Sequence, residues 1–374
     1  MAQPASQNSH RALLVLSFGG PEKNEDVIPF LENVTRGRGI PRERLAEVGE
    51  HYFAMDGKSP ITDQNLRIIA DLESLIAERV TPLSDGSTAL PVYFGNRNWH
   101  PFVEDTVAQM ARDGVTEALV LATSAWGGYS GHVQYLEDIA RAEASCRDAG
   151  LTPPTMTKIR PFHDHPLFRA AFARLIDETR AAMPADQRQD ARLLFAAHSI
   201  PVSADETSSA DSTHRYSGQV ITAAREIREL SSFAVDGAAG ADVELVWQSR
   251  SGPPHIPWLE PDICDFLEAT VAGEGMASAS GEVSPGGDRR PVLLCPVGFI
   301  TDHMEVIWDL DTEARDTAAE LGVPLVRVPT PGLEPEFPRM ILDLVHEHWA
   351  DIPGEDAGNA PDAGAAAPAG PAVS

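Results

Sequence analysis

The chain has 374 residues, of which 43% are hydrophobic and 23% are charged. This composition supports a large buried core and excludes a chain that is disordered throughout. At about one domain per 150 residues, the length predicts two or three domains. Lys and Arg number 29 against 56 Asp and Glu, and the net charge of −27 argues against a general binder of nucleic acids or anionic membranes. An anionic small molecule would need a local basic pocket.

The sequence also indicates the compartment. No run approaches the roughly 18 apolar residues of a membrane-spanning helix. The polar start of the chain, MAQPASQNSHR, lacks the apolar core of a secretory signal. The three cysteines, Cys146, Cys264 and Cys295, are too few to cross-link a chain of this length. We therefore expect a cytoplasmic protein without integral membrane contact.

Short apolar runs alternate with longer helical patterns along the chain. The expected strands span residues 12–17, 91–94, 118–122, 192–197, 243–247, 292–295 and 325–328. The expected helices span residues 62–79, 101–113, 133–149, 166–183, 212–230, 261–271, 303–321 and 335–349. This alternation predicts a parallel α/β protein. Seven or eight such units fit two doubly wound domains better than one sheet or a TIM barrel.

The same pattern predicts the domain boundaries. We expect an N-terminal domain over residues 11–152 and a C-terminal domain over residues 153–334, divided near the Thr-Pro-Pro sequence at 152–154. Three further segments are rich in small and polar residues and lack periodicity. They are the disordered N-terminus 1–10, a mobile loop 273–290 and a disordered tail 352–374.

Ligands of open α/β sheets bind beyond the carboxyl ends of the strands, so the loops after the strands carry the functional information. The first such loop, SFGGPE, is not a dinucleotide fingerprint, because it is not G-x-G-x-x-G and Pro21 lacks an amide donor. No Walker A sequence is present, which argues against an NAD or ATP enzyme. Ser130 is not in a nucleophile elbow, since His132 takes the position of the last glycine. A glycine turn is the better interpretation there.

A histidine follows the apolar strand at 192–197. His198 stands at the carboxyl end of that strand, and Pro201 stiffens the chain as it leaves. An imidazole in this place would point toward a ligand. A histidine with a purely structural role is the alternative interpretation.

An acidic row follows the expected strand at 292–295. Glu305, Asp309 and Glu313 are four residues apart, so a helix would place them on one face. One interpretation is a solvated face. The other is a path for a cation or for protons, because the apolar residues 306–308 indicate a helix that is largely buried.

His198 and Glu305 would together offer one nitrogen and one oxygen ligand to a divalent metal, with open positions. Two protein ligands are too few for a structural zinc site. This pair therefore fits a passing metal ion better than a resident one.

A basic cluster stands out in a chain of this charge. It consists of Arg36, Arg38, Arg42 and Lys58, and Ser59 adds a hydroxyl. The cluster could hold the carboxylates of a ligand. A solvated basic loop is the alternative.

These segments resemble the ferrochelatases, and most closely the bacterial branch that acts on coproporphyrin. The resemblance runs in order over residues 12–349. It is carried by LVLSFGGPE, VTRGRGIP, DGKSPITDQN, NRNWHPF, TSAWGGYSGHVQY, AHSIP and CPVGFITDHMEVIWDLD. It implies two similar Rossmann-like domains with parallel four-stranded sheets and an active-site cleft between them. It also implies that the C-terminal helix, 335–349, packs back on the first domain.

The resemblance further implies a role for each site residue. His198 and Glu305 match the family's cleft histidine and facing glutamate, which carry the metal-ligand and proton-acceptor roles. Asp309 and Glu313 match an acidic ridge for metal or protons. Ser59 and Tyr135 match positions that contact the porphyrin, and Arg36 and Arg38 match a loop that meets propionates. Ferrous iron is then a substrate, with no resident cofactor.

Two departures from the family pattern concern iron. Many members of the coproporphyrin branch have a tyrosine that can ligate the inserted iron, and Phe18 stands in its place. The axial ligand of the product iron is therefore unassigned. Some relatives bind a [2Fe–2S] cluster, but His132 occupies the first cluster position and no cysteine follows Cys295. We expect no such cluster.

The expected substrates are Fe2+ and coproporphyrin III, and the expected product is Fe-coproporphyrin III. The cations available near the expected cleft are Arg36, Arg38, Arg42, Lys58 and Arg97. Three alternatives stay open: protoporphyrin IX as the porphyrin, another metal or tetrapyrrole, and a haem carrier without activity. We expect a monomer.

Overall fold

A computed structural model describes residues 10–37, 39–81, 90–209, 211, 214–234, 243–251, 255–283 and 286–354. Most of the N-terminus and of the tail expected to be disordered lies outside these ranges, as does Arg38. Within them, no helix is both long enough and apolar enough to cross a membrane.

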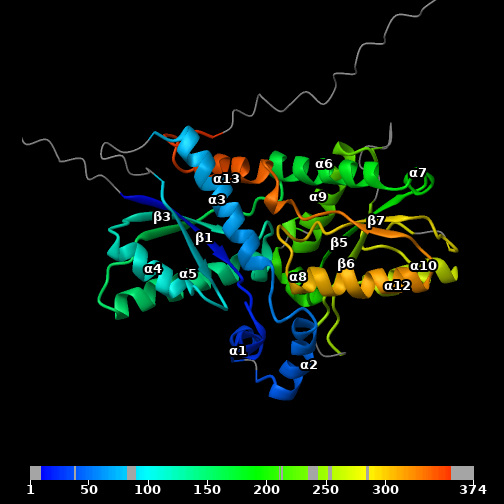
Figure 1. Ribbon diagram of the computed structural model, residues 1–374, viewed down its shortest axis with the longest axis horizontal. Coiled ribbons are helices and arrows are strands. Elements are labelled where there is room, and N and C mark those ends of the chain that lie inside the picture. Colours follow the sequence, from blue (N-terminus) through cyan, green and yellow to red (C-terminus); the bar gives the residue numbers. More distant parts are fainter. Residues whose placement is uncertain are drawn as a thin grey trace, which may run out of the picture.

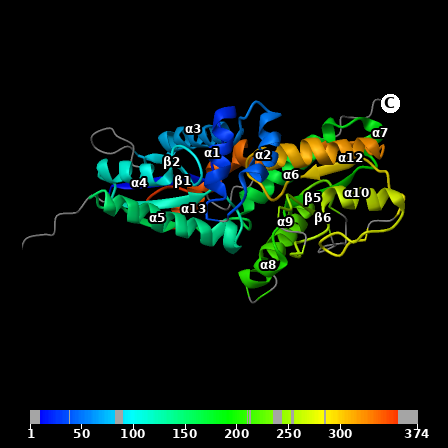
Figure 2. The same cartoon turned by 90° about the horizontal axis from the view of Figure 1, so that it is seen from below.

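Two parallel four-stranded sheets form the framework. The strand order is β2-β1-β3-β4 in the first sheet and β6-β5-β7-β8 in the second, so each half follows the same path. The strands are β1 (Arg11–Ser17), β2 (Val92–Asn96), β3 (Glu117–Ala122), β4 (Thr155–Lys158), β5 (Arg192–His198), β6 (Glu244–Gln248), β7 (Val292–Cys295) and β8 (Leu325–Arg327). Figures 1 and 2 show the two halves side by side along the long axis. The expected α/β fold with two Rossmann-like sheets is confirmed.

Helices cover both faces of each sheet (Figure 1). They are α1 (Asn24–Val34), α2 (Arg42–Phe53), α3 (Ile61–Arg79), α4 (Val103–Arg112), α5 (Gln134–Asp148), α6 (Pro166–Ala182), α7 (Ala185–Arg188), α8 (Val202–Ser208), α9 (Tyr216–Leu230), α10 (Ile263–Ala272), α11 (Met304–Trp308), α12 (Arg315–Glu320) and α13 (Glu336–His346). Two π-helical turns, η1 (Tyr129–Val133) and η3 (Asp309–Ala314), and a short 3-10 turn, η4 (Pro331–Leu333), complete the elements.

The alternation of side chains along each strand explains the layers. Leu13 and Val15 of β1 share a core with α3 and α13, whereas Ala12, Leu14 and Leu16 pack with α4 and α5. In the second half, the faces of β5 pack in the same way, against α6 and α9 on one side and α10 to α12 on the other. Strands buried on both faces are nearly continuous in apolar residues, as the sequence indicates.

One apolar core runs through both halves. Leu13 of β1, Phe172 of α6, Phe195 of β5 and Met340 of α13 belong to the same buried cluster. Helix α13 packs against α3 of the first half and against α6. The residues after it also return to the first half, where Asp351 lies 2.7 Å from Arg11. The C-terminal helix therefore joins both halves rather than the first alone.

Parts of the structure differ from the sequence-based expectation. Residues 155–158 form β4 at the edge of the first sheet, so that sheet continues past the expected boundary at 152. The run TMTK was missed because two of its four residues are exposed and it has no apolar stretch. Helices α1 and α2, which we call the lip, were also missed and project from the junction of the halves (Figure 1).

The segment expected to be a mobile loop makes fixed contacts where the structure describes it. The amide of Ala279 donates to Leu245 of β6 at 2.7 Å, and that of Gly287 donates to Thr270 of α10 at 2.8 Å. The mobility of residues 273–290 stays a prediction. Ile352 is buried, so the folded part extends into the range that was assigned to the tail.

Candidate active site

The carboxyl ends of β5, β6 and β7 bring the polar residues of the second half together. His198 ends β5 and Gln248 ends β6. The loop after β7 crosses the end of β5 so closely that a Cβ atom on Gly298 would lie 2.8 Å from Cα of Ala197. This close approach, which only glycine allows, directs the chain toward the N-terminus of α11 and Glu305.

His198 and Glu305 face each other. The imidazole Nε2 lies 3.4 Å from Oε2 of the carboxylate. The other ring nitrogen, Nδ1, donates to the backbone carbonyl of Ser199. That hydrogen bond places the ring proton on Nδ1 and leaves Nε2 as the nitrogen that exchanges a proton or binds a metal. The backbone carbonyl of His198 accepts from the hydroxyl of Tyr216 at 2.9 Å, which fixes the strand end.

The pair is charged in the ligand-free protein at neutral pH. Burial disfavours the imidazolium, but the neighbouring Glu305 carboxylate more than offsets it and raises the pKa of His198 to about 9. Burial acts against the ionised Glu305 too, yet the positive His198 lowers the pKa of Glu305 to about 2. A metal ion that takes Nε2 must therefore first displace a proton.

Asp309 lies four residues after Glu305, and its pKa is shifted in the opposite direction. Burial, together with the negative charges of Glu305 and Glu313, raises the pKa of Asp309 to about 7, against the hydrogen bond donated by Ser249. Gln248 donates to the backbone carbonyl of Glu305 at 3.0 Å. Ser249 adopts a left-handed backbone conformation with φ of 64°. Such strain in a residue other than glycine is common at functional sites.

The acidic row is not one straight helical face. The sequence predicts a continuous α-helix over 303–321, but residues 309–314 form a π-helical turn between α11 and α12. Within this turn, Glu313 accepts from the indole nitrogen of Trp308 at 3.0 Å. π-helical turns of this kind are frequent at functional sites.

The lip contacts this acidic run from the other half. The ring of His51 in α2 stacks on Trp308, with centroids 4.1 Å apart and planes 8° from parallel. The hydroxyl of the neighbouring Tyr52 is buried, and that burial together with the charges of Glu305 and Asp309 raises the pKa of Tyr52. The lip thus covers one side of the row of carboxylates.

The predicted porphyrin contacts lie at the carboxyl ends of the first sheet, and both are buried. Ser59 is 2% exposed and Tyr135 is 4% exposed. The guanidinium of Arg97 lies over the rings of Tyr135 and Phe18, at 4.9 and 5.6 Å from their centroids, and pairs with buried Asp138. Arg97 is therefore already paired. The porphyrin contacts of Ser59 and Tyr135 stay predictions.

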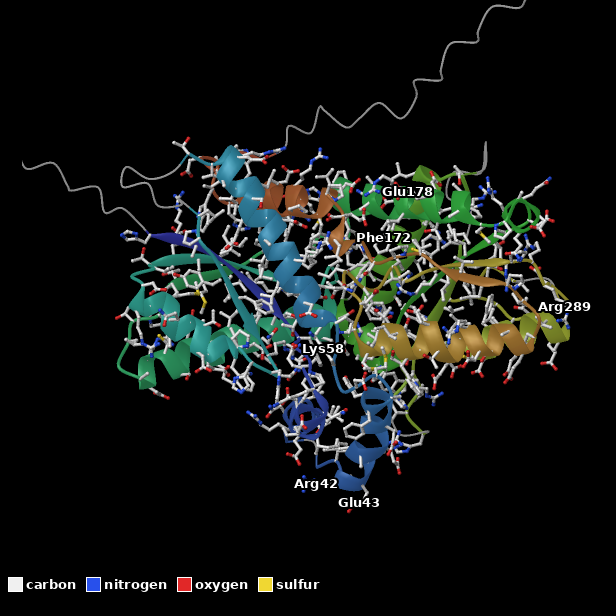
Figure 3. The ribbon with its side chains drawn as sticks, in the orientation of Figure 1. Arg42, Glu43, Lys58, Phe172, Glu178 and Arg289 are labelled. Carbon is white, nitrogen blue, oxygen red and sulfur yellow. The ribbon has the colours of Figure 1, made fainter. Side chains whose placement is uncertain are left out.

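The basic cluster is spread along the lip rather than gathered. Figure 3 shows Arg42 at the tip of the lip and Lys58 at its base near α3. Lys58 pairs with Asp63 at 2.7 Å, and Arg42 lies 3.6 Å from Glu32. Arg36 is exposed and donates to the amide oxygen of Asn33. Among the described cations of this cluster, only Arg36 has no carboxylate within ion-pair distance.

Several residues around the site were not singled out from the sequence. Gln248 ends β6 and Ser249 follows it, so the rule that located His198 could have found them. Tyr216 and His51 lie on helices without a motif, and nothing in the sequence connects them with His198 or Trp308.

Comparison with known proteins supplies the family. The model of the family described as Ferrochelatase matches residues 10–349. The chain belongs to the ferrochelatase family. The resemblance inferred from the sequence is therefore confirmed, and the His198–Glu305 pair lies within the matched range.

Relatives of this ferrochelatase family member align over nearly its whole length. A coproporphyrin III ferrochelatase of Nocardia farcinica is 54% identical over 339 residues, which cover 90% of this chain and 88% of the relative. One of Mycolicibacterium smegmatis is 47% identical and covers 92% of both chains. One of Corynebacterium glutamicum is 47% identical and covers 90% of this chain and 83% of the relative.

A solved structure supports the fold. SirB from Bacillus subtilis with Fe3+ aligns with a TM-score of 0.50 and 12% identity, and covers 92% of this chain and 99% of that one. At this identity the likeness shows the shared architecture alone.

Proposed function

We propose that this protein is a coproporphyrin III ferrochelatase, a lyase that inserts Fe2+ into coproporphyrin III to give Fe-coproporphyrin III in haem biosynthesis. The observation that carries the proposal is the contact between His198 and Glu305 at the strand ends of a chain that matches the ferrochelatase family over residues 10–349.

Insertion requires an acceptor for two pyrrole protons and a route by which they leave. We assign the acceptor role to the His198–Glu305 pair. Once the proton on Nε2 has been displaced and passed onward, Nε2 and the Glu305 carboxylate have lone pairs that can accept the pyrrole protons. Asp309, whose pKa of about 7 lies close to neutral pH, is suited to pass a proton onward. Glu313 is exposed and gives the row an outlet to solvent.

Iron is a substrate that binds only in passing. His198 Nε2 and a Glu305 oxygen form an N/O pair that suits a ferrous ion without enclosing it. Because the same atoms carry the proton of the ion pair, the arrival of iron and the departure of that proton are coupled. The Fe2+ and the pyrrole protons therefore compete for one pair of residues.

Coproporphyrin III is supported as the porphyrin by the names of relatives at 47–54% identity. Its four propionates need cationic or hydroxyl partners, and Arg36, Arg38, Ser59 and Tyr135 are assigned to that task. Arg36 is the member for which the structure gives the clearest support, since it is exposed and has no carboxylate partner among the described residues.

We further propose that the protein acts as a cytoplasmic monomer without a resident cofactor. This rests on the cysteine content and on the charge of the chain.

The test is an anaerobic absorbance assay with ferrous iron and each porphyrin. Conversion of the free-base spectrum of coproporphyrin III to that of its iron complex supports the proposal. Tight binding of Fe-coproporphyrin III without any insertion would instead indicate a carrier. Insertion of Co2+ but not Fe2+ would indicate a chelatase for another metal.

A further inference from the structure

Arg327 connects a carboxylate before the acidic row, Asp302, with one inside it, Asp311. It ends β8, and its side chain is 16% exposed. Its Nε and Nη2 donate to the two oxygens of Asp311 at 2.7 and 2.9 Å. Its Nη1 and Nη2 also donate to the two oxygens of Asp302 at 3.1 and 3.3 Å. A planar guanidinium is suited to such a double fork, which an ammonium group cannot reproduce.

The two partners lie close in sequence to the residues assigned to chemistry. Asp302 precedes Glu305 by three positions, and Asp311 lies between Asp309 and Glu313. Fixing Asp302 and Asp311 from one side chain therefore holds the segment both before Glu305 and within the π-helical turn that carries Asp309 and Glu313.

The start of the segment is also tied to the first half. The amide of Asp302 donates to the side-chain oxygen of Gln64 in α3 at 2.8 Å, and Thr330 donates to its carboxylate at 3.1 Å. Asp302 is thus held by Gln64, Thr330 and Arg327. Because Arg327 also binds Asp311, it fixes Asp311 relative to Asp302.

Asp311 lies inside the π-helical turn η3. A π-helical turn contains one more residue than an α-helical turn, and one residue corresponds to about 100° of rotation around a helix axis. If the run relaxed to a regular α-helix, Glu313 would rotate by about that angle relative to Glu305. Asp311 would then leave the fork of Arg327.

We infer that Arg327 is a positioning residue that, through Asp302 and Asp311, holds the π-helical turn in register and so fixes Glu305, Asp309 and Glu313 relative to one another. The inference rests on the proposed function, because it assigns Arg327 to the steps in which iron binds and protons leave. It does not involve the porphyrin contacts of the first half.

The experiment compares Arg327→Lys with a matched control, Arg174→Lys. Arg174 also forks two carboxylates, Glu336 at 2.8 Å and Glu334 at 2.6 Å. It lies in α6, on the face of the second sheet opposite α12, where Figure 3 labels its third partner Glu178. Arg174→Lys therefore also disrupts an arginine–carboxylate network, but at a place away from the acidic row.

Two readouts are needed. In the insertion assay, Arg327→Lys is expected to raise KM for Fe2+ and lower kcat by about ten- to a hundred-fold, as a misplaced catalytic group does, with the porphyrin Kd unchanged. In hydrogen exchange, the amides of residues 304–320 are expected to exchange faster in Arg327→Lys and to keep the wild-type rate in Arg174→Lys.

Equal kinetics for the two variants, or unchanged exchange over residues 304–320, would overturn the inference. If the wild-type protein inserts no metal, the proposed function fails, and the exchange readout alone then decides whether Arg327 holds the turn. Asp311→Asn, which changes only one end of the fork, serves if Arg327→Lys does not fold, and the same directions are expected.

Discussion

His198 at the end of β5 and Glu305 in the helix that follows the neighbouring strand β7 meet with 3.4 Å between Nε2 and Oε2. The two residues belong to different elements, because His198 ends β5 and Glu305 lies in the first turn of α11, the helix after β7. Their contact is a product of the parallel sheet, whose strands all deliver their carboxyl ends to one edge.

Removing the imidazole should abolish insertion without unfolding the protein. We expect His198→Ala to lower the rate by about 10²- to 10⁴-fold, because it removes the proposed proton acceptor and one proposed metal ligand. The anaerobic absorbance assay measures the rate, and circular dichroism checks the fold. His214→Ala, at an exposed histidine paired with Asp211, is the control. Near-normal turnover in a folded His198→Ala protein would remove His198 from the mechanism.

Glu305→Gln should separate chemistry from porphyrin binding. The amide keeps the shape but not the charge, so we expect turnover to fall about a hundred-fold or more while porphyrin affinity changes little. Fluorescence titration gives the affinity and single-turnover kinetics give the rate. Glu320→Gln, an exposed position farther along the same run, is the control. A large loss of affinity with unchanged turnover would assign Glu305 to substrate binding instead.

Asp309 should weaken the fold at neutral and higher pH. Its pKa is about 7 in the folded protein, against 3.8 ordinarily, so the folded state binds this proton more tightly than the unfolded state. The contribution of Asp309 to the stability of the wild-type protein therefore falls as pH rises from about 4 to 7, and that loss persists above this range. Asp309→Asn removes this penalty.

We therefore expect the free energy of unfolding of Asp309→Asn at pH 8 to exceed that of wild type by about 1–3 kcal/mol, a range that is reduced for the screening of this carboxylate by solvent. At pH 5 the difference in the free energy of unfolding should be smaller. Urea unfolding at both pH values measures the difference. Asp316→Asn on the exposed side of α12 is the control. A stability difference that does not change with pH would contradict the assignment.

Coproporphyrin III should be preferred over protoporphyrin IX. Each propionate held by a charge-assisted hydrogen bond contributes about 1.5–3 kcal/mol, and protoporphyrin has two fewer. We expect Arg36→Ala to reduce the ratio of kcat/KM for coproporphyrin III to kcat/KM for protoporphyrin IX. Arg147 is paired with Glu143, and Arg147→Ala should leave this ratio unchanged. The ratio is measured at two salt concentrations, because exposed cations are screened. A ratio near one in the wild type would leave only the general ferrochelatase activity.

The purified protein should carry no [2Fe–2S] cluster. Four thiolate ligands are normally needed, and the chain has three cysteines, which lie in α5, α10 and β7. Assay of acid-labile sulfide and the visible spectrum check this. Stoichiometric sulfide with charge-transfer absorption would show that the cluster is present.

Much of the fold could be predicted because its strands are buried on both faces. All seven expected strands exist. A short, continuous apolar run such as 292–295 is typical of a strand that is buried on both faces. The edge strand β4 has the polar sequence TMTK and gives no such pattern. Helix α2 has only Leu45 and Gly49 buried, so it lacks the apolar stripe by which a helix is recognised.

Part of the candidate site could also be predicted from the sequence, and part could not. His198 and Glu305 could be located because each follows a recognisable strand. The π-helical turn at 309–314 has no pattern in the sequence, because its register depends on contacts such as that of Asp311 with Arg327, 16 positions away. The raised pKa of Asp309 likewise depends on burial in the fold, and Ser249, which follows the distant strand β6, opposes it.

The apolar core that joins Leu13, Phe195 and Met340 has a thermodynamic consequence. Two sheets with separate cores would melt one after the other, but a core shared through α13 leaves neither half with a complete interior of its own. Heat should therefore unfold both sheets in a single cooperative transition, with equal calorimetric and van't Hoff enthalpies. A ligand that binds only the second sheet would then protect the first sheet from unfolding to the same degree.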